Sequence, residues 1–102
     1  MGLLDLLGLG GKSDAIAEFV TKGAVIIDVR TVSEFTSGHI QSSKNIPLDT
    51  LASKIEEIKK LNKPVIACCR SGMRSAQATS ILKQNGIEAI NGGGWESLQR
   101  KL

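Results

Sequence analysis

Aromatic residues are scarce in this 102-residue chain, which has one Trp, two Phe and no Tyr. Charge of one sign is also not in large excess, because 13 Lys and Arg, scattered along the sequence, stand against 10 Asp and Glu. A nucleic-acid interface typically combines a basic face with aromatic side chains that stack on bases. The composition therefore predicts no nucleic-acid partner, while a net charge of +3 remains compatible with small anionic ligands.

Cysteine is limited to the adjacent pair Cys68 and Cys69. Neighbours in sequence rarely form a disulfide with each other, so we expect reduced thiols and a cytoplasmic protein. The apolar start of the chain is too short to span a bilayer, carries Asp5, and lacks the basic region of a signal peptide. We interpret residues 1–12 as an amphipathic segment that docks on the domain or on a partner, and residues 13–102 as a single domain.

Helical and strand-like segments alternate along the rest of the chain. Hydrophobic periodicity and breaking residues predict strands at residues 24–29, 44–46, 64–69 and 87–90, and helices at residues 13–22, 31–38, 49–61, 74–84 and 95–102. Such alternation predicts a parallel or mostly parallel sheet covered by helices. We interpret the run Gly92-Gly93-Gly94 as a tight turn.

The strand at residues 64–69 ends in a cysteine and runs directly into a short loop and a helix. Such a loop points backbone N–H groups and the positive end of the helix dipole at one place. The sulfur of Cys69, held at this place and flanked by Arg70 and Arg74, is expected to favour the thiolate. The thiolate is the nucleophilic form of cysteine. Gly72 is suited to a loop that wraps around a single atom, because it adopts backbone angles that other residues resist.

The run Cys69-Arg70-Ser71-Gly72-Met73-Arg74-Ser75 resembles the active-site loop of rhodaneses, C-x-x-G-x-R-S. Further segments resemble the signatures of the same family, in the same order, and the resemblance spans about residues 25–98. These segments are Ile27-Asp28-Val29-Arg30, Glu34-Phe35, Gly38-His39-Ile40, Asn45-Ile46-Pro47 and Gly93-Gly94-Trp95.

The resemblance implies an α/β fold, the rhodanese-like three-layer sandwich, with a five-stranded, mainly parallel sheet and helices on both sides. It also implies a thiosulfate sulfurtransferase that needs neither a metal nor an organic cofactor. Cys69 would take sulfur from thiosulfate or another persulfide donor and, as a persulfide, pass it to cyanide, a thiol or a sulfur-accepting protein. Independently of the resemblance, no membrane span is expected.

The loop residues after the nucleophile are the candidate substrate-binding residues: Arg70, Ser71, Gly72, Met73 and Arg74. Arg70 either attracts an anionic donor or is a solvated surface charge. A cation at a helix N-terminus is unfavourable unless a carboxylate pairs with it, so we expect Arg74 to form a structural ion pair with Asp28 or Glu34.

Other polar residues have a structural interpretation beside the functional one. Asp28 and Arg30 follow a strand's carboxyl end, where open α/β sheets bind ligands, and they would support the loop. His39 is expected to be a hydrogen-bonded, partly buried structural residue. Trp95 would either line the pocket or anchor the core. Strand alternation turns Cys68 away from the loop and into the core.

Two alternatives remain open at this point. With Cys68 as nucleophile, the spacing to Arg74 is that of C-x5-R phosphatases, although Gly72 then falls one place late and Cys69 lies inside the loop. A non-catalytic rhodanese-like binding module is the other alternative. It is typically associated with loss of the cysteine, which this chain retains.

Overall fold

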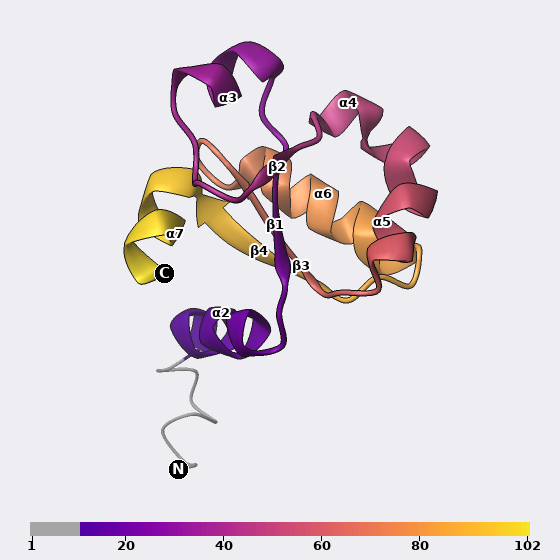
Figure 1. Ribbon diagram of the computed structural model, residues 1–102, viewed down its shortest axis with the longest axis horizontal. Helices are drawn as coiled ribbons and strands as arrows, with labels where there is room; N and C mark the ends of the chain where they lie inside the picture. The colour runs from indigo at the N-terminus through magenta and orange to yellow at the C-terminus, as the bar shows by residue number, and fades with distance from the viewer. Residues whose placement is uncertain (1–10) are drawn as a thin grey trace.

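The computed structural model describes residues 11–102 and shows a parallel sheet with helices on both faces (Figure 1). The strands of the described residues lie in the order β2-β1-β3-β4, and each neighbouring pair is parallel. Their bounds are β1 Val25–Asp28, β2 Lys44–Asn45, β3 Val65–Cys69 and β4 Ala89–Gly94. The helical elements are α2 Gly11–Thr21, α3 Val32–Ser37, α4 Leu48–Leu51, η1 Ala52–Lys54, α5 Ile55–Leu61, α6 Met73–Gln84 and α7 Trp95–Lys101.

The expectation of a five-stranded sheet is wrong for the described residues, because their sheet has four strands. Each of the four corresponds to an extended segment that the sequence pattern predicts. The fifth strand was implied by the family resemblance alone, and no further apolar segment between residues 11 and 102 supplies it. The expected amphipathic segment at residues 1–12 lies outside the described residues except for its last two positions, which belong to α2.

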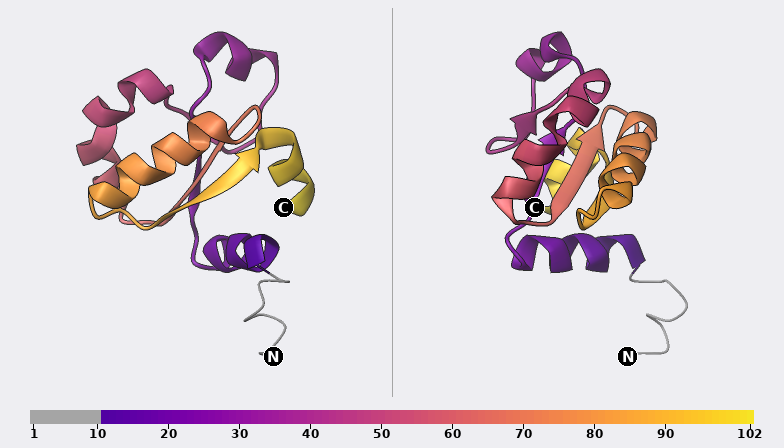
Figure 2. Two further views of the ribbon diagram at one scale, coloured as in Figure 1. Left: turned by 180° about the vertical axis from the view of Figure 1, so that it is seen from behind. Right: turned by 90° about the vertical axis from the view of Figure 1, so that its right-hand side faces the viewer.

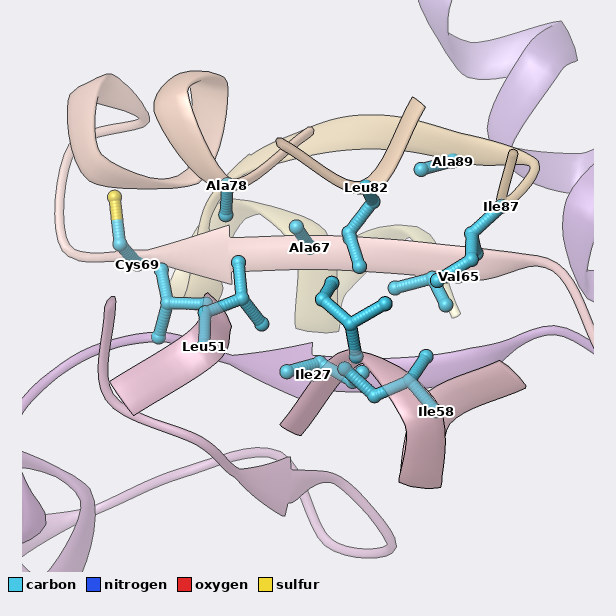
Figure 3. Packing of buried hydrophobic residues seen from close by; sticks show 12 residues of the cluster. Ile27, Leu51, Ile58, Val65, Ala67, Cys69, Ala78, Leu82, Ile87 and Ala89 are labelled. Atoms are coloured by element: carbon cyan, nitrogen blue, oxygen red, sulfur yellow. The ribbon is translucent and has the colours of Figure 1, made fainter. Parts of the chain in front are cut away.

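Two apolar cores lie on opposite faces of the sheet, because side chains along a strand alternate between its faces. Ile27, Ala67 and Cys69 belong to the core on the face covered by α4, α5 and α6, part of which is shown in Figure 3. Ile66 and Cys68 belong to the core on the face covered by α2 and α7. Figure 2 shows α6 and α7 on opposite sides of the sheet. Burial on both faces explains why β1 and β3 are apolar along nearly their whole length.

The helix expected at residues 49–61 is divided into α4, the 3-10 turn η1 and α5. Two hydroxyl groups bond to backbone carbonyls here: Thr50 Oγ1 donates to Pro47 O at 3.0 Å, and Ser53 Oγ donates to Thr50 O at 2.7 Å. Such bonds compete with the regular helical pattern. The predicted inward face is nevertheless retained, because Leu51 and Ile55 are buried.

The tight turn expected at Gly92–Gly94 is wrong, because these residues continue strand β4. Ala67 pairs with Asn91 but Cys68 pairs with Gly93, so Gly92 is the extra residue of a β-bulge. A Cβ atom on Gly92 would lie 2.8 Å from Ile66 Cγ2 and 3.1 Å from Ala67 O. The glycine is therefore explained by close packing against β3.

None of the helices within residues 11–102 combines the length and the apolar character that a transmembrane segment requires.

Candidate functional site

Cys69 is the last residue of β3, and its sulfur points toward the side on which Ala78 and Leu82 of α6 lie (Figure 3). Gly72 N–H donates to Cys69 Sγ at 3.0 Å, and Ser75 N–H donates to it at 3.4 Å. Ser75 Oγ lies 3.3 Å from the same sulfur. Gly72 adopts the left-handed conformation, with φ of 103°, at the residue that precedes α6. The strand end, the loop and the first turn of the helix thus converge on one sulfur atom.

The pKa of Cys69 is set by two opposing effects. Burial raises it, because a charged sulfur loses solvation, whereas hydrogen bonds from the Ser75 hydroxyl and from the N–H groups of Ser75, Gly72 and Ser71 lower it. The donors outweigh burial, and the pKa of Cys69 lies below its ordinary value of 9.0. The site therefore stabilises a thiolate at this position.

Cys68 lies among apolar side chains on the opposite face of the sheet. Burial and the neighbouring Asp28 carboxylate raise the pKa of Cys68 to about 12, although Arg30 acts in the other direction. A thiol with this pKa stays protonated near neutral pH. The environment therefore opposes the alternative in which Cys68 is the nucleophile of a phosphatase.

Asn91 of β4 joins the loop to the sheet. Its Nδ2 donates to Gly72 O at 3.1 Å, and its Oδ1 accepts from Ser75 Oγ at 2.7 Å and from Gly93 N at 2.9 Å. Asn91 pairs with Ala67 in register, which places its side chain on the α6 face of the sheet. The sequence alone predicts no role for Asn91 or Ser75, because a contact between two segments so far apart along the chain leaves no local pattern.

The end of β4 also packs directly against the loop. A Cβ atom on Gly94 would lie 2.6 Å from Arg70 O, which is shorter than any ordinary contact. Gly94 has φ of −70°, an angle open to any residue. Close approach of two backbones therefore explains the glycine, and it fixes the height of the loop above the strand.

Arg74 forms an ion pair with Glu34, one of the two carboxylates that the sequence analysis considered. The two side chains are joined by hydrogen bonds of 2.7 Å and 3.1 Å. Glu34 also closes a capping box with Thr31 at the start of α3. Arg74 first, and then the Thr31 backbone, lowers the pKa of Glu34 from 4.5 to about 2. The pair joins α3 to the first turn of α6. The Glu34 carboxylate compensates for the unfavourable position of the Arg74 charge at the positive end of the helix dipole.

Asp28 and Arg30 form a second, buried ion pair. The Arg30 guanidinium donates to both carboxylate oxygens of Asp28, with Nη2–Oδ2 at 2.7 Å and Nε–Oδ1 at 2.9 Å. It also donates to Glu34 O at 3.2 Å and Gly38 O at 2.7 Å, and it lies 4.9 Å from the centre of the Trp95 ring. Arg30 thereby ties the end of β1 to α3 and to Gly38 at its C-terminal end, and it contacts the backbone of Glu34, the residue whose side chain pairs with Arg74.

Arg70 is exposed, and it contributes to a shallow cleft beside the loop. The cleft has a volume of about 310 Å³ and is also lined by Arg30, Glu34, Ser37, Trp95 and Glu96. Trp95 packs against the core on the α2 and α7 face, and it also lines this cleft. Ser71 and Met73 are exposed, and Met73 is one of the most exposed large apolar residues of the described chain, at 77%.

His39 is hydrogen-bonded, as expected, but it is exposed rather than partly buried. Its Nδ1 lies 2.7 Å from Phe35 O, and its ring stacks on the Phe35 ring with centroids 3.7 Å apart. These contacts hold the turn that follows α3. Within residues 11–102, no group of three or more His, Cys, Asp or Glu side chains is arranged to hold a metal ion.

Comparison with known proteins identifies the family. Residues 12–101 match the family of the Rhodanese-like domain, which is nearly the whole chain, and the protein belongs to this family. The fold is accordingly the α/β fold of rhodanese-like domains, with a parallel sheet and flanking helices.

Individual relatives agree with this assignment. The uncharacterized protein YqhL of Bacillus subtilis is 42% identical over 67 residues, which cover 66% of this chain and 52% of the relative. A sulfurtransferase of Allochromatium vinosum is 35% identical over 70 residues, which cover 69% of this chain and 64% of the relative. The chain thus spans about half to two thirds of the length of these two relatives. A structure of a rhodanese with anions from E. coli superimposes with a TM-score of 0.66 at 32% identity, covering 72% of this chain and 89% of that one.

Proposed function

We propose that this protein is a thiosulfate sulfurtransferase in which Cys69 carries the transferred sulfur. The observation that carries the proposal is the set of donors around Cys69 Sγ, namely the N–H groups of Gly72 and Ser75 together with the Ser75 hydroxyl. These donors favour the thiolate, which is the nucleophilic form of cysteine. Membership of a family with relatives named sulfurtransferase supports the same chemistry.

The reaction has two displacement steps. The Cys69 thiolate attacks the outer sulfur of thiosulfate, the bond between the two thiosulfate sulfurs breaks, and sulfite leaves with the electron pair. The product on the protein is the Cys69 persulfide. A nucleophilic acceptor such as cyanide or a thiol then attacks the outer sulfur, and the electron pair of the broken S–S bond returns to Cys69 Sγ. The protein itself needs to supply only an activated sulfur and a polar environment for it.

The residues beside Cys69 have separate roles in this proposal. Arg70 is exposed in the cleft beside the loop, where a cation attracts an anionic donor such as thiosulfate. The backbone of Ser71 and Gly72 supports the sulfur. Arg74 is engaged with Glu34, so it positions the loop rather than meeting the donor as a free charge. Met73 is exposed beside the loop, where an acceptor can contact it.

The test is the intact mass of the protein after treatment with thiosulfate, followed by cyanide. We expect the mass of one added sulfur atom after the first step and its loss after the second, with thiocyanate released. Cys68→Ala is the matched control, because it removes the neighbouring thiol and leaves Cys69 in place. The proposal would be contradicted if the parent protein gained no sulfur. It would also be contradicted if the Cys69→Ser variant gained sulfur as the parent does.

The same assay separates the alternatives. A binding module without catalytic activity would not load sulfur on Cys69. A phosphatase would hydrolyse an aryl phosphate faster than it transfers sulfur, and we expect no such hydrolysis. Only four residues lie between Cys69 and Arg74, and the resulting short loop holds its N–H groups close to the sulfur. Such a loop favours one added sulfur atom over a tetrahedral phosphate.

A further inference from the structure

The Ser75 hydroxyl lies between two atoms that compete for its hydrogen. Ser75 Oγ is 3.3 Å from Cys69 Sγ and 2.7 Å from Asn91 Oδ1. A serine hydroxyl donates one hydrogen and accepts through its lone pairs. Ser75 is fully buried, so these neighbours define its hydrogen bonding. The hydrogen is therefore donated to the sulfur or to the amide oxygen, and not to both.

The orientation of the Asn91 amide is fixed by two backbone groups. Gly93 N–H can only donate, and it lies 2.9 Å from Asn91 Oδ1. Gly72 C=O can only accept, and it lies 3.1 Å from Asn91 Nδ2. If the amide were rotated by half a turn, Asn91 Nδ2 would face the Gly93 N–H, which is also a donor. Asn91 Oδ1 would then face Gly72 C=O, which is also an acceptor. The atom that faces Ser75 is therefore an oxygen, which only accepts.

The two protonation states of Cys69 require different hydrogen-bond patterns. In the thiol, Cys69 S–H donates to Ser75 Oγ, and Ser75 O–H donates to Asn91 Oδ1, so that every group has a partner. In the thiolate, the charged sulfur attracts the Ser75 hydrogen more strongly than a neutral amide does. Once that hydrogen turns to the sulfur, Ser75 Oγ and Asn91 Oδ1 are left facing each other at 2.7 Å with no hydrogen between them.

We propose that Asn91 is a positioning residue that limits how strongly the Ser75 hydroxyl supports the Cys69 thiolate, because it holds the same hydrogen. The proposal rests on the proposed function of Cys69 as the sulfur carrier. When an acceptor removes the outer sulfur, the electron pair of the S–S bond returns to Cys69 Sγ, and the Ser75 hydrogen turns from Asn91 to the sulfur. Asn91 opposes that turn and so preserves nucleophilicity, which decreases as a thiolate becomes better stabilised.

Charged and titratable groups also surround Cys69, and the test must keep them constant. From the elements packed around the loop these are Arg70, Arg74, Glu34, Asp28, Arg30 and Cys68. None of the charged residues is altered in the variants below. Cys68 is replaced by Ala in all of them, so that a single thiol titrates.

The experiment is a double-mutant cycle on the pKa of Cys69, measured by the ultraviolet absorbance of the thiolate. The chain has no Tyr, so no phenolate contributes to the signal. Four proteins are compared, all carrying Cys68→Ala: the parent, Ser75→Ala, Asn91→Leu, and the two changes together. Leu has the same number and branching of side-chain heavy atoms as Asn, is somewhat larger, and has no polar atoms. We expect the shift that Asn91→Leu causes in the pKa of Cys69 to be more negative by about half a unit to one unit when Ser75 is present than in the Ser75→Ala background.

The cycle separates this role from a structural one. Asn91→Leu also removes the bonds to Gly72 O and Gly93 N, but that loss is common to both backgrounds and cancels. An equal shift in both backgrounds would mean that Asn91 acts by holding the loop, and would overturn the proposal. A shift that is more positive with Ser75 present than without it would also overturn the proposal. Asn91→Ala repeats the cycle if circular dichroism and melting show that the larger side chain disturbs the fold.

Failure of this inference is distinguishable from failure of the proposed function, because the titration uses no sulfur donor. If Cys69 does not load sulfur, the proposed function fails, whatever the cycle shows. If it loads sulfur but the cycle shows no coupling between Asn91 and Ser75, only the inference fails. Single-turnover release of sulfur to cyanide gives a further readout. We expect Ser75→Ala to slow that step by roughly tenfold, because the leaving thiolate loses a hydroxyl donor.

Discussion

Cys68 and Cys69 are covalent neighbours at the end of one strand, yet their sulfur atoms lie on opposite faces of the sheet. Cys69 faces the loop and the first turn of α6, where two N–H groups and a hydroxyl surround it. Cys68 faces an apolar core beside Asp28. The pKa of Cys69 is lowered, whereas that of Cys68 is raised to about 12.

The comparison shows what lowers the pKa of a buried thiol in this fold. Both side chains are almost completely buried, so burial does not distinguish them. The difference is the supply of hydrogen-bond donors, which the loop provides on one face only. A shift of one residue along the strand is enough to exchange the two environments, because the side chains of a strand alternate.

The largest effect that would test this comparison is removal of each sulfur in turn. We expect Cys69→Ser to reduce thiosulfate turnover to the background level, because the oxygen is a far weaker nucleophile at neutral pH. Cys68→Ala should keep most of the activity, since this thiol has no part in the proposed chemistry. The measurement is thiocyanate formation, with circular dichroism to confirm folding. If the effects of the two variants were exchanged, the choice of nucleophile would be wrong.

The second prediction concerns the backbone beneath the Cys69 loop. Gly94→Ala places a Cβ atom 2.6 Å from Arg70 O, so the loop or β4 must move. We expect a loss of about 1–3 kcal/mol in the free energy of unfolding and a large loss of sulfur transfer, because the donors leave Cys69 Sγ. Ser97→Ala on the exposed side of α7 is the control. Unchanged activity in Gly94→Ala would show that the loop tolerates displacement.

The third prediction compares the two thiols directly by titration. The Cys68→Ala variant should show a thiolate midpoint below 9.0, and the Cys69→Ser variant should show one near 12. Thiolate absorbance measures both without any need for a reagent to reach a buried sulfur. Equal midpoints in the two variants would remove the physical basis of the comparison.

A smaller effect is expected from the ion pair that holds the loop from α3. The pKa of Glu34 is lowered from 4.5 to about 2, chiefly by Arg74. The lowered pKa means that the contribution of the pair to stability is fully present above pH 4.5 and is lost as the pH falls through about 2. Both side chains are about one third exposed, so we expect Arg74→Gln to lower the melting temperature at pH 7 by only a few degrees.

The pH dependence provides the control for this pair. Glu34→Gln should lower the melting temperature to a similar extent, and both variants should lose less stability than the parent between pH 4.5 and about 2. If Arg74→Gln abolished sulfur transfer while Glu34→Gln left it intact, Arg74 would act on the donor itself rather than through the loop.

The smallest effect is expected for the exposed charge beside the loop. Arg70→Gln should raise the KM for thiosulfate and leave kcat nearly unchanged, because in the proposed function Arg70 attracts the anion without contacting Cys69 Sγ. The increase should be larger at low ionic strength, since salt screens an exposed charge. Arg100→Gln, a similar change on the exposed side of α7, should have no such effect.

The sequence predicts most of the fold and the centre of the site. Apolar β-branched runs predict β1 and β3, and strand alternation correctly separates Cys68 from Cys69. The position of Arg74 at a helix N-terminus correctly predicts that it pairs with a carboxylate. These features follow from neighbouring residues, whose spacing is visible in the sequence. The roles proposed for the loop residues in binding and catalysis remain predictions.

Features that depend on long-range packing were not visible in the sequence. The run Gly92–Gly94 contains residues typical of a turn, but packing against Ile66 and Arg70 makes it a bulged strand. Asn91 shows no motif of its own. Its role emerges only when β4 pairs with β3 and brings it to Ser75. The same limit applies to the number of strands, because the fifth was implied by resemblance and not by a segment of the described chain.

The pairing of β3 with β4 has a consequence for the order in which the molecule assembles. Every strand pair in the sheet is parallel, so each requires a crossover, and such non-local pairing is slow to form. Asn91 and Gly94, which fix the loop, lie in the last of these strands. We therefore expect the pKa of Cys69 to be lowered only after β4 has paired with β3 during refolding. Fast thiolate chemistry at this cysteine would then be a kinetic marker of the native state, read without any added label.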